Sequence, residues 1–165
     1  MGVPSGLAEH FLATDGALPE LQSLCVLWRE RPWILDLPSL CASLARITAK
    51  LDVHPHAPTL ALNIDVREGF RDVEASMSPE FIMREDIAAG CARVKNLTIH
   101  LDVKARHAWV VARLVALFPR TESLSLLTGG MAMHESIIAT LLQAVKPTRW
   151  LKELKFNGKS RSLSE

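Results

Sequence analysis

The chain has 165 residues, of which 48% are hydrophobic, 22% charged and 5% aromatic. This composition is typical of a globular domain and excludes a disordered or fibrous chain. Nineteen lysine and arginine residues stand against eighteen acidic residues, which leaves a net charge of +1. Such a balance gives no broad attraction for a phosphate backbone or an anionic membrane, so nucleic acid and membranes are not predicted as partners.

The cysteines and the apolar segments indicate a cytoplasmic or nuclear protein. Cys25, Cys41 and Cys91 are widely spaced and form no Cys-x-x-Cys pair, which favours reduced, buried thiols. The first ten residues have no basic segment followed by an apolar one, so no secretory signal is predicted. Residues 108–118 are the most apolar stretch, and they are shorter than the roughly 20 residues that a membrane helix needs.

The first third of the chain is predicted to be helical. A helix ended by Pro32 is indicated by apolar residues at helical spacing, namely Leu18, Leu21, Leu24, Cys25 and Trp28. A second helix begins at Pro38, where a first turn tolerates proline, and it has one apolar stripe of Leu37, Leu40, Leu44, Ile47 and Leu51. Two prolines within residues 54–58 disfavour helix. We therefore expect a helical N-terminal segment over 1–56 and a β-α repeat domain over 57–165, packed as one unit.

From residue 58 the hydrophobic period changes from helical to two. Residues 60–66 and 97–103 alternate aliphatic and polar side chains, which predicts two half-buried strands. The two segments also match each other, and shorter copies follow at 124–127 and 151–157. Alignment of Leu60, Leu97, Leu124 and Leu154 gives repeat steps of 37, 27 and 30 residues, which indicates an internal repeat.

Helices are predicted between these strands. Apolar faces mark helices over 110–118 and 137–145, each followed by a proline, which ends a helix. A weaker helix is predicted from Ser78 to Cys91, after a polar connection over 67–77. The repeating unit is therefore a strand followed by a helix.

The polar positions within the strands decide between α/β folds. A doubly wound sheet is covered on both faces, so its strands would be continuous apolar runs. The alternation instead predicts a sheet with helices on one face, as in a short leucine-rich-repeat-like β-α solenoid preceded by N-terminal helices. A compact two-layer α/β sandwich is the alternative. In either case the polar strand positions form one surface.

Several segments resemble a known family. Residues 94–99, 121–126 and 151–157 look like degenerate forms of the Leu-x-x-Leu-x-Leu-x-x-Asn strand of leucine-rich repeats. Residues 116–126 are similar to the irregular repeats of fungal F-box leucine-rich-repeat proteins, and residues 18–33 resemble a shortened F-box. The resemblance implies a protein that binds other proteins and catalyses no reaction, as the substrate-recognition component of a ubiquitin-ligase-type complex.

The predicted contact residues for a protein partner come from the polar strand positions and from two tryptophans. Tryptophan fills cores or anchors interfaces; Trp109 and Trp150 are expected in the core, whereas Trp28 and Trp33 lie near charged residues. The predicted contact residues are therefore Asn63, Asp65, His100, Asp102, Ser125, Lys155, Trp28 and Trp33.

An enzyme is the first alternative function. Asp65 and Asp102 occupy equivalent positions in the aligned repeats, and with His100 they could form a hydrolase-like site. Carboxylates at strand ends more often cap helices, so no catalytic residue is predicted. The two histidines of 54–56 lack further ligands, and residues 128–131 lack the lysine of a phosphate-binding loop. We therefore predict neither a metal nor a cofactor.

A truncated structural fragment is the second alternative. No polar capping unit follows the last repeat, so the final strand is expected to leave an open edge. This predicts a monomer, or weak self-association through that edge.

Overall fold

The computed structural model describes residues 3–13, 20–28, 34–53, 58–66, 69–70, 84–101, 108–128, 138–140, 142–143, 149–156 and 159–162. Its elements begin with β1 (Val3–Pro4), α1 (Ser5–Ala13), β2 (Ser23–Trp28), β3 (Ile34–Leu35), α2 (Leu37–Asp52), β4 (Thr59–Val66) and β5 (Gly69–Phe70). They continue with α5 (Glu85–Ala92), β6 (Val94–Leu101), α6 (Ala108–Ala116), β7 (Ser123–Thr128), β8 (Glu153–Phe156) and β9 (Lys159–Ser162). Residues 138–140 and 142–143 are also helical.

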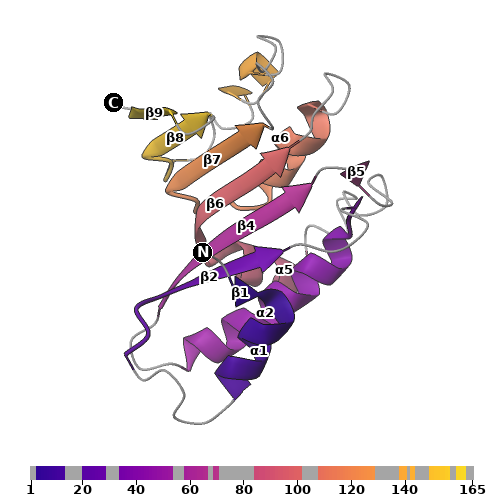
Figure 1. Ribbon diagram of the computed structural model, residues 1–165, viewed down its shortest axis with the longest axis vertical. Helices are drawn as coiled ribbons and strands as arrows, with labels where there is room; N and C mark the ends of the chain where they lie inside the picture. Colours follow the sequence, from indigo (N-terminus) through magenta and orange to yellow (C-terminus); the bar gives the residue numbers. More distant parts are fainter. Residues whose placement is uncertain are drawn as a thin grey trace.

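The main sheet has seven strands in the order β1-β2-β4-β6-β7-β8-β9 (Figure 1). Neighbouring strands are parallel except for β9, which runs antiparallel to β8. Each new strand is added on the same side of the previous one, and right-handed crossovers then place the connecting helices on one face. The predicted α/β class is confirmed. β3 and β5 form a separate two-stranded parallel sheet.

One face of the main sheet forms the core. Because strand side chains alternate between faces, residues in register form rows that point the same way. One row contains Val26, Leu62, Leu97, Leu124 and Leu154, all buried. A second row contains Trp28, Ile64, Ile99, Leu126 and Phe156. The helices complete this core with Leu40, Leu44, Ile47 and Leu51 of α2, Ile87 and Cys91 of α5, and Leu114 of α6.

Helix α2 forms where the sequence predicts it. Asp36 is the N-cap, and its side chain accepts a hydrogen bond of 3.2 Å from the backbone N–H of Ser39. Pro38 occupies the first turn, where its missing N–H costs nothing. The predicted apolar stripe is buried throughout. The helix prediction over 37–51 is confirmed.

The helix predicted over 18–28 is wrong in its described part, because residues 23–28 form β2. Leu24, Val26 and Trp28 are buried on the core face, and the residues between them are partly exposed. The segment is apolar at nearly every position, so it fits a strand as well as a helix. β2 pairs with β4, and residues before 57 therefore contribute a strand to the same sheet as the later units. The helical segment nearer the start of the chain is α1, which lies within the predicted helical segment of 1–56 although no individual helix is predicted there.

The repeat alignment is confirmed in its second half and corrected in its first. Leu97, Leu124 and Leu154 are register partners, as the steps of 27 and 30 require. On β4, however, Leu97 pairs with Leu62 and not with Leu60. The β4–β6 register shifts between Leu60 and Ala61, whose partners are Val94 and Asn96, so Lys95 has no partner on β4. Lys95 is thus the extra residue of a β-bulge.

The remaining elements agree with prediction where they are described. The strands of 60–66, 97–101 and 124–127 and the helices of α5 and α6 are present. The start of the predicted 78–91 helix, the two histidines of 54–56 and residues 129–131 lie outside the described ranges. Within the predicted polar connection of 67–77, residues 69–70 form β5. The last repeat strand is not itself the edge of the sheet, since β9 pairs with β8, and the terminal strand of the sheet is β9.

Candidate functional site

The face of the sheet opposite the core carries mostly polar side chains. Its central row joins Leu27, Asn63, Thr98, Ser125 and Lys155 through successive register pairs, and each side chain is partly exposed. A second row contains Cys25, Ala61, Asn96, Ser123 and Glu153, and a shorter third row contains Asp65, His100 and Leu127. We call these three rows the open face.

The structure brings together five of the eight predicted contact residues. Asn63, Ser125 and Lys155 share the central row, while Asp65 and His100 are register partners in the adjacent row. Asp65 is only 7% exposed, so it is a buried member of this row. Asp102 and Trp33 lie outside the described ranges.

Trp28 is placed on the other side of the sheet. Its side chain is 4% exposed and belongs to the core cluster, so the prediction that it contacts a partner is corrected. The indole Nε1 of Trp28 is buried and has no hydrogen-bond acceptor among the described residues. The charged residues near Trp28 in the sequence do not decide which face of the sheet its side chain occupies. The two-residue period of the strand places Trp28 on the same face as Leu24 and Val26.

A polar network occupies the β7–β8 part of the open face. The Ser123 hydroxyl donates a hydrogen bond of 3.0 Å to Oε2 of Glu153, and Lys155 Nζ lies 2.7 Å from the same oxygen. The hydrogen bond from Lys155 and then that from Ser123 lower the pKa of Glu153. The charge of Lys155 is therefore balanced by its neighbour. On β4, Oδ1 of Asn63 is buried without a hydrogen-bond donor in the described part of the chain.

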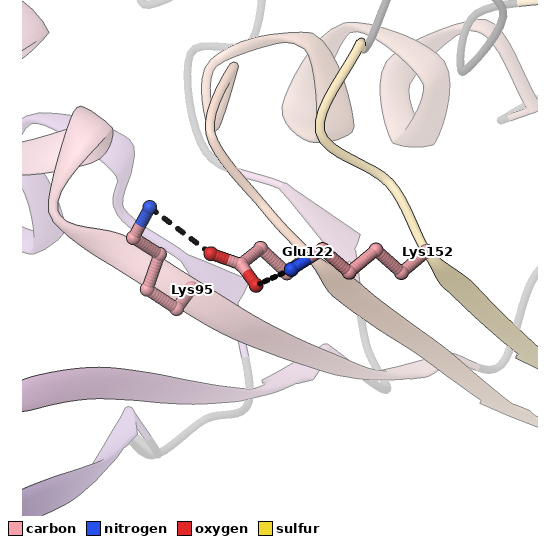
Figure 2. Close-up of polar contacts among 3 residues, drawn as sticks. All are labelled: Lys95, Glu122 and Lys152. Carbon is pink, nitrogen blue, oxygen red and sulfur yellow. Dashed lines mark hydrogen bonds and ion pairs between the residues drawn. The ribbon is translucent and has the colours of Figure 1, made fainter.

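A second cluster lies where β6, β7 and β8 begin. Figure 2 shows the Glu122 carboxylate between two lysines, 3.2 Å from Lys95 Nζ and 2.8 Å from Lys152 Nζ. The hydrogen bond from Lys152 and then that from Lys95 lower the pKa of Glu122. Lys95 Nζ also lies 5.6 Å from the ring centroid of Trp150, within range of a cation–π interaction. We call Lys95, Glu122, Trp150 and Lys152 the rim cluster.

The sequence analysis did not identify the rim cluster. Trp150 was expected in the core, but its side chain is 52% exposed, so that expectation is wrong. A signal was present: a charged residue stands two positions before each core leucine of the last three repeats, as Lys95, Glu122 and Lys152. Because these leucines are register partners, the three charged residues lie next to one another where neighbouring strands begin.

The hydrolase-like arrangement is changed by the observed register. The sequence alignment made Asp65 equivalent to Asp102. In the observed register Asp65 lies opposite His100, so that equivalence is wrong. Among the residues that the structure describes, no three histidine, cysteine or acidic side chains are grouped so as to hold a metal ion. Nor does any described helix have the length and apolar character to cross a membrane.

Comparison with known proteins adds no relative. No protein-family model matches the chain, and neither the curated proteins nor the solved structures gave a match. The resemblance to leucine-rich repeats and to an F-box therefore stays a prediction. Function has to be inferred from the open face and the rim cluster.

Proposed function

We propose that this protein is an interaction module that binds a protein partner through the open face. The observation that supports the proposal is the central row, in which five strands present partly exposed side chains in register. Neighbouring strands lie about 4.8 Å apart, so these side chains form a regular array. Parallel sheets are normally covered on both faces, and no described helix covers this one.

A leucine-rich-repeat-like arrangement is part of the proposal. Its support is the sequential strand order, the register of Leu97, Leu124 and Leu154, and the single apolar face. Solenoids of this kind stack one unit beside the next and bind partners over an extended surface. Substrate recognition in a ubiquitin-ligase-type complex is the setting that the F-box resemblance adds. Residues 24–28, which carry part of that resemblance, lie in β2.

Site-specific photo-crosslinking on the full chain tests the proposal. A photoreactive residue at Thr98 or Ser125 reports on the open face, and one at Ala49, exposed on α2, is the matched control. We expect a defined partner to crosslink from the open-face positions and not from Ala49. Substitution Asn63→Arg, in the same row, should abolish the crosslink at Ser125.

The same experiment can overturn the proposal. Crosslinks of equal yield from Ala49, or crosslinks that persist in Asn63→Arg, would place the contact elsewhere. Ubiquitin-ligase adaptor subunits among the purified partners would support the ligase setting. Their absence, with an open-face partner still present, would remove that setting and leave the interaction module.

A hydrolase is the second candidate, because the register brings Asp65 and His100 side by side. A carboxylate beside an imidazole can orient the ring, and the imidazole can then accept a proton during the reaction. A broad screen with ester, amide and phosphate substrates would detect such an activity. If an activity is found and Asp65→Asn leaves it unchanged, the carboxylate takes no part and this candidate fails.

A further inference from the structure

Basic side chains collect at the amino ends of β6, β7 and β8. Arg93 directly precedes β6, and Lys95 lies within its first residues. Arg120 lies in the turn before β7, and Arg149 and Lys152 lie in the segment before β8. The three strands are parallel and in register, so their amino ends meet at one edge of the sheet. We call this edge the basic rim.

The acidic residues near the basic rim are already paired. Asp52, which ends α2, lies 3.2 Å from Arg93. Glu122 bridges the lysines of the rim cluster, and Glu153 pairs with Lys155. Two further cations, Arg120 and Arg149, are exposed and form no ion pair with the residues that the structure describes. The rim therefore carries an excess of positive charge, although the whole chain has a net charge of +1.

Trp150 supplies an apolar contact at the same place. It follows Arg149 in the chain, and its side chain is 52% exposed. Tryptophan and arginine are both enriched in the energetic centres of protein interfaces. Its ring is also close to Lys95 Nζ, at 5.6 Å from the centroid.

The rim is held in place before any ligand binds. Lys95 is the extra residue of β6 at the register shift, and such an irregularity takes a side chain out of the regular ladder. Glu122 then fixes the amino groups of Lys95 and Lys152 on its two sides (Figure 2). Backbone bonds support this arrangement, since Glu122 N–H donates to the Lys95 carbonyl at 2.7 Å and Lys152 N–H donates to the Glu122 carbonyl at 2.8 Å. Side chains already ordered lose less entropy on binding.

We propose that the basic rim binds an acidic segment of a protein, whose carboxylates contact Arg120, Arg149 and Lys152 and whose apolar residue packs on Trp150. This site adjoins the second row of the open face but is formed by other residues, and it does not require the proposed function. A peptide fits better than nucleic acid because the positive excess is local. The carboxylates of Glu122 and Glu153 interrupt the surface, whereas a nucleic-acid backbone needs many successive cations.

A fluorescence anisotropy titration of the full chain tests the site. The probe is a fluorescein-labelled heptapeptide with a central leucine and glutamate at the other six positions. We expect saturable binding that quenches tryptophan fluorescence and weakens with added salt. Trp150→Ala and Arg149→Glu should each weaken binding by about thirtyfold, the lower bound for an interface hot spot.

A matched variant separates the rim from general charge. Arg46→Glu makes the same charge change on the exposed side of α2, and it should bind the peptide as the unmodified chain does. Circular dichroism should show all three variants folded, as expected for exposed positions. A peptide with glutamine at the six acidic positions should not bind.

Three results would overturn the proposal. The first is no saturable binding of the acidic peptide by the full chain. The second is an equal loss in Arg46→Glu and Arg149→Glu, which would indicate unspecific attraction. The third is tighter binding of a single-stranded oligonucleotide of the same length than of the peptide, which would assign the rim to nucleic acid. Each result is independent of crosslinking at Ser125, so failure here and failure of the open-face proposal can be told apart.

Discussion

Asp65 of β4 lies directly opposite His100 of β6 in the register of the sheet. The same register pairs Leu62 with Leu97 on the core side. A slip of one residue in this pairing would move the apolar side chains of a strand out of the core and its polar side chains into it. The register that buries the apolar rows therefore also determines which side chains lie on the open face.

Leu97→Ala should destabilise the fold strongly. Leu97 is 1% exposed and lies in the middle of the leucine row, so truncation leaves a cavity and should lower the free energy of unfolding by about 2–5 kcal/mol. Thr98→Ala, the next residue on the open face, should cost less than about 1 kcal/mol. Urea denaturation of both variants measures the difference. Equal losses would contradict the assignment of the two faces.

Gly90→Val should force α5 away from α2. A Cβ atom at Gly90 would lie 3.1 Å from the backbone nitrogen of Ala45, and a helix backbone cannot yield as a flexible side chain can. We expect a loss of about 2 kcal/mol, typical of overpacking. Ala89→Val, exposed on the same helix, is the control and should cost roughly 0.6 kcal/mol from helix propensity alone. A stability for Gly90→Val equal to that of the control would argue against the close approach of the helices.

Glu122→Gln should lower stability modestly and change its pH dependence. The lysine pairs of Glu122 are partly exposed, so their loss should cost about 0.5–1 kcal/mol at neutral pH. Because folding lowers the pKa of Glu122, the stabilisation is present above the ordinary value of 4.5 and disappears as the pH falls through the folded-state pKa below it.

Urea denaturation of the unmodified chain and of Glu122→Gln across this pH range measures the effect. The stability difference between them should shrink below pH 4.5. Glu20→Gln, at an exposed position before β2, is the control for the loss of one surface carboxylate. A difference that stays constant into acid would show that the carboxylate charge is not what stabilises the rim cluster.

Thiol labelling should distinguish the cysteines. Cys25 is partly exposed on the open face, whereas Cys41 and Cys91 are buried in the core, and none of the three is in a disulfide. A thiol reagent should therefore modify one cysteine rapidly and the other two only on unfolding. Cys25→Ser should remove the rapid phase. Rapid modification that persists in this variant would contradict the burial of the other two thiols.

The sequence predicted the elements whose period was unambiguous. α2, β4, β6 and β7 were identified because their apolar residues fit one period and not the other. β2 was not, because apolar residues at nearly every position satisfy both the helix and the strand pattern. Trp28 was predicted to contact a partner because charged residues follow it in the sequence, and such neighbours do not decide which face of a strand a side chain occupies.

The register could not be predicted to the same accuracy. Leu60 and Leu62 both precede aliphatic residues at alternate positions, so pattern matching cannot decide which of them pairs with Leu97. The bulge at Lys95 decides it, and a bulge depends on packing between strands that are distant in sequence. The open face was thus predictable as a surface, but the pairing of Asp65 with His100 was not.

The direction of β9 limits how far the sheet can grow. From β1 to β8 every strand points the same way, and an identical unit could in principle be appended by the same helical connection. β9 reverses the chain against β8, so the polarity needed for that connection is lost at this edge. Its residues Lys159 and Arg161 also put two positive charges on the outermost strand, which discourages pairing with another copy. The parallel order of the sheet thus ends at β9, which gives this edge an antiparallel and positively charged strand.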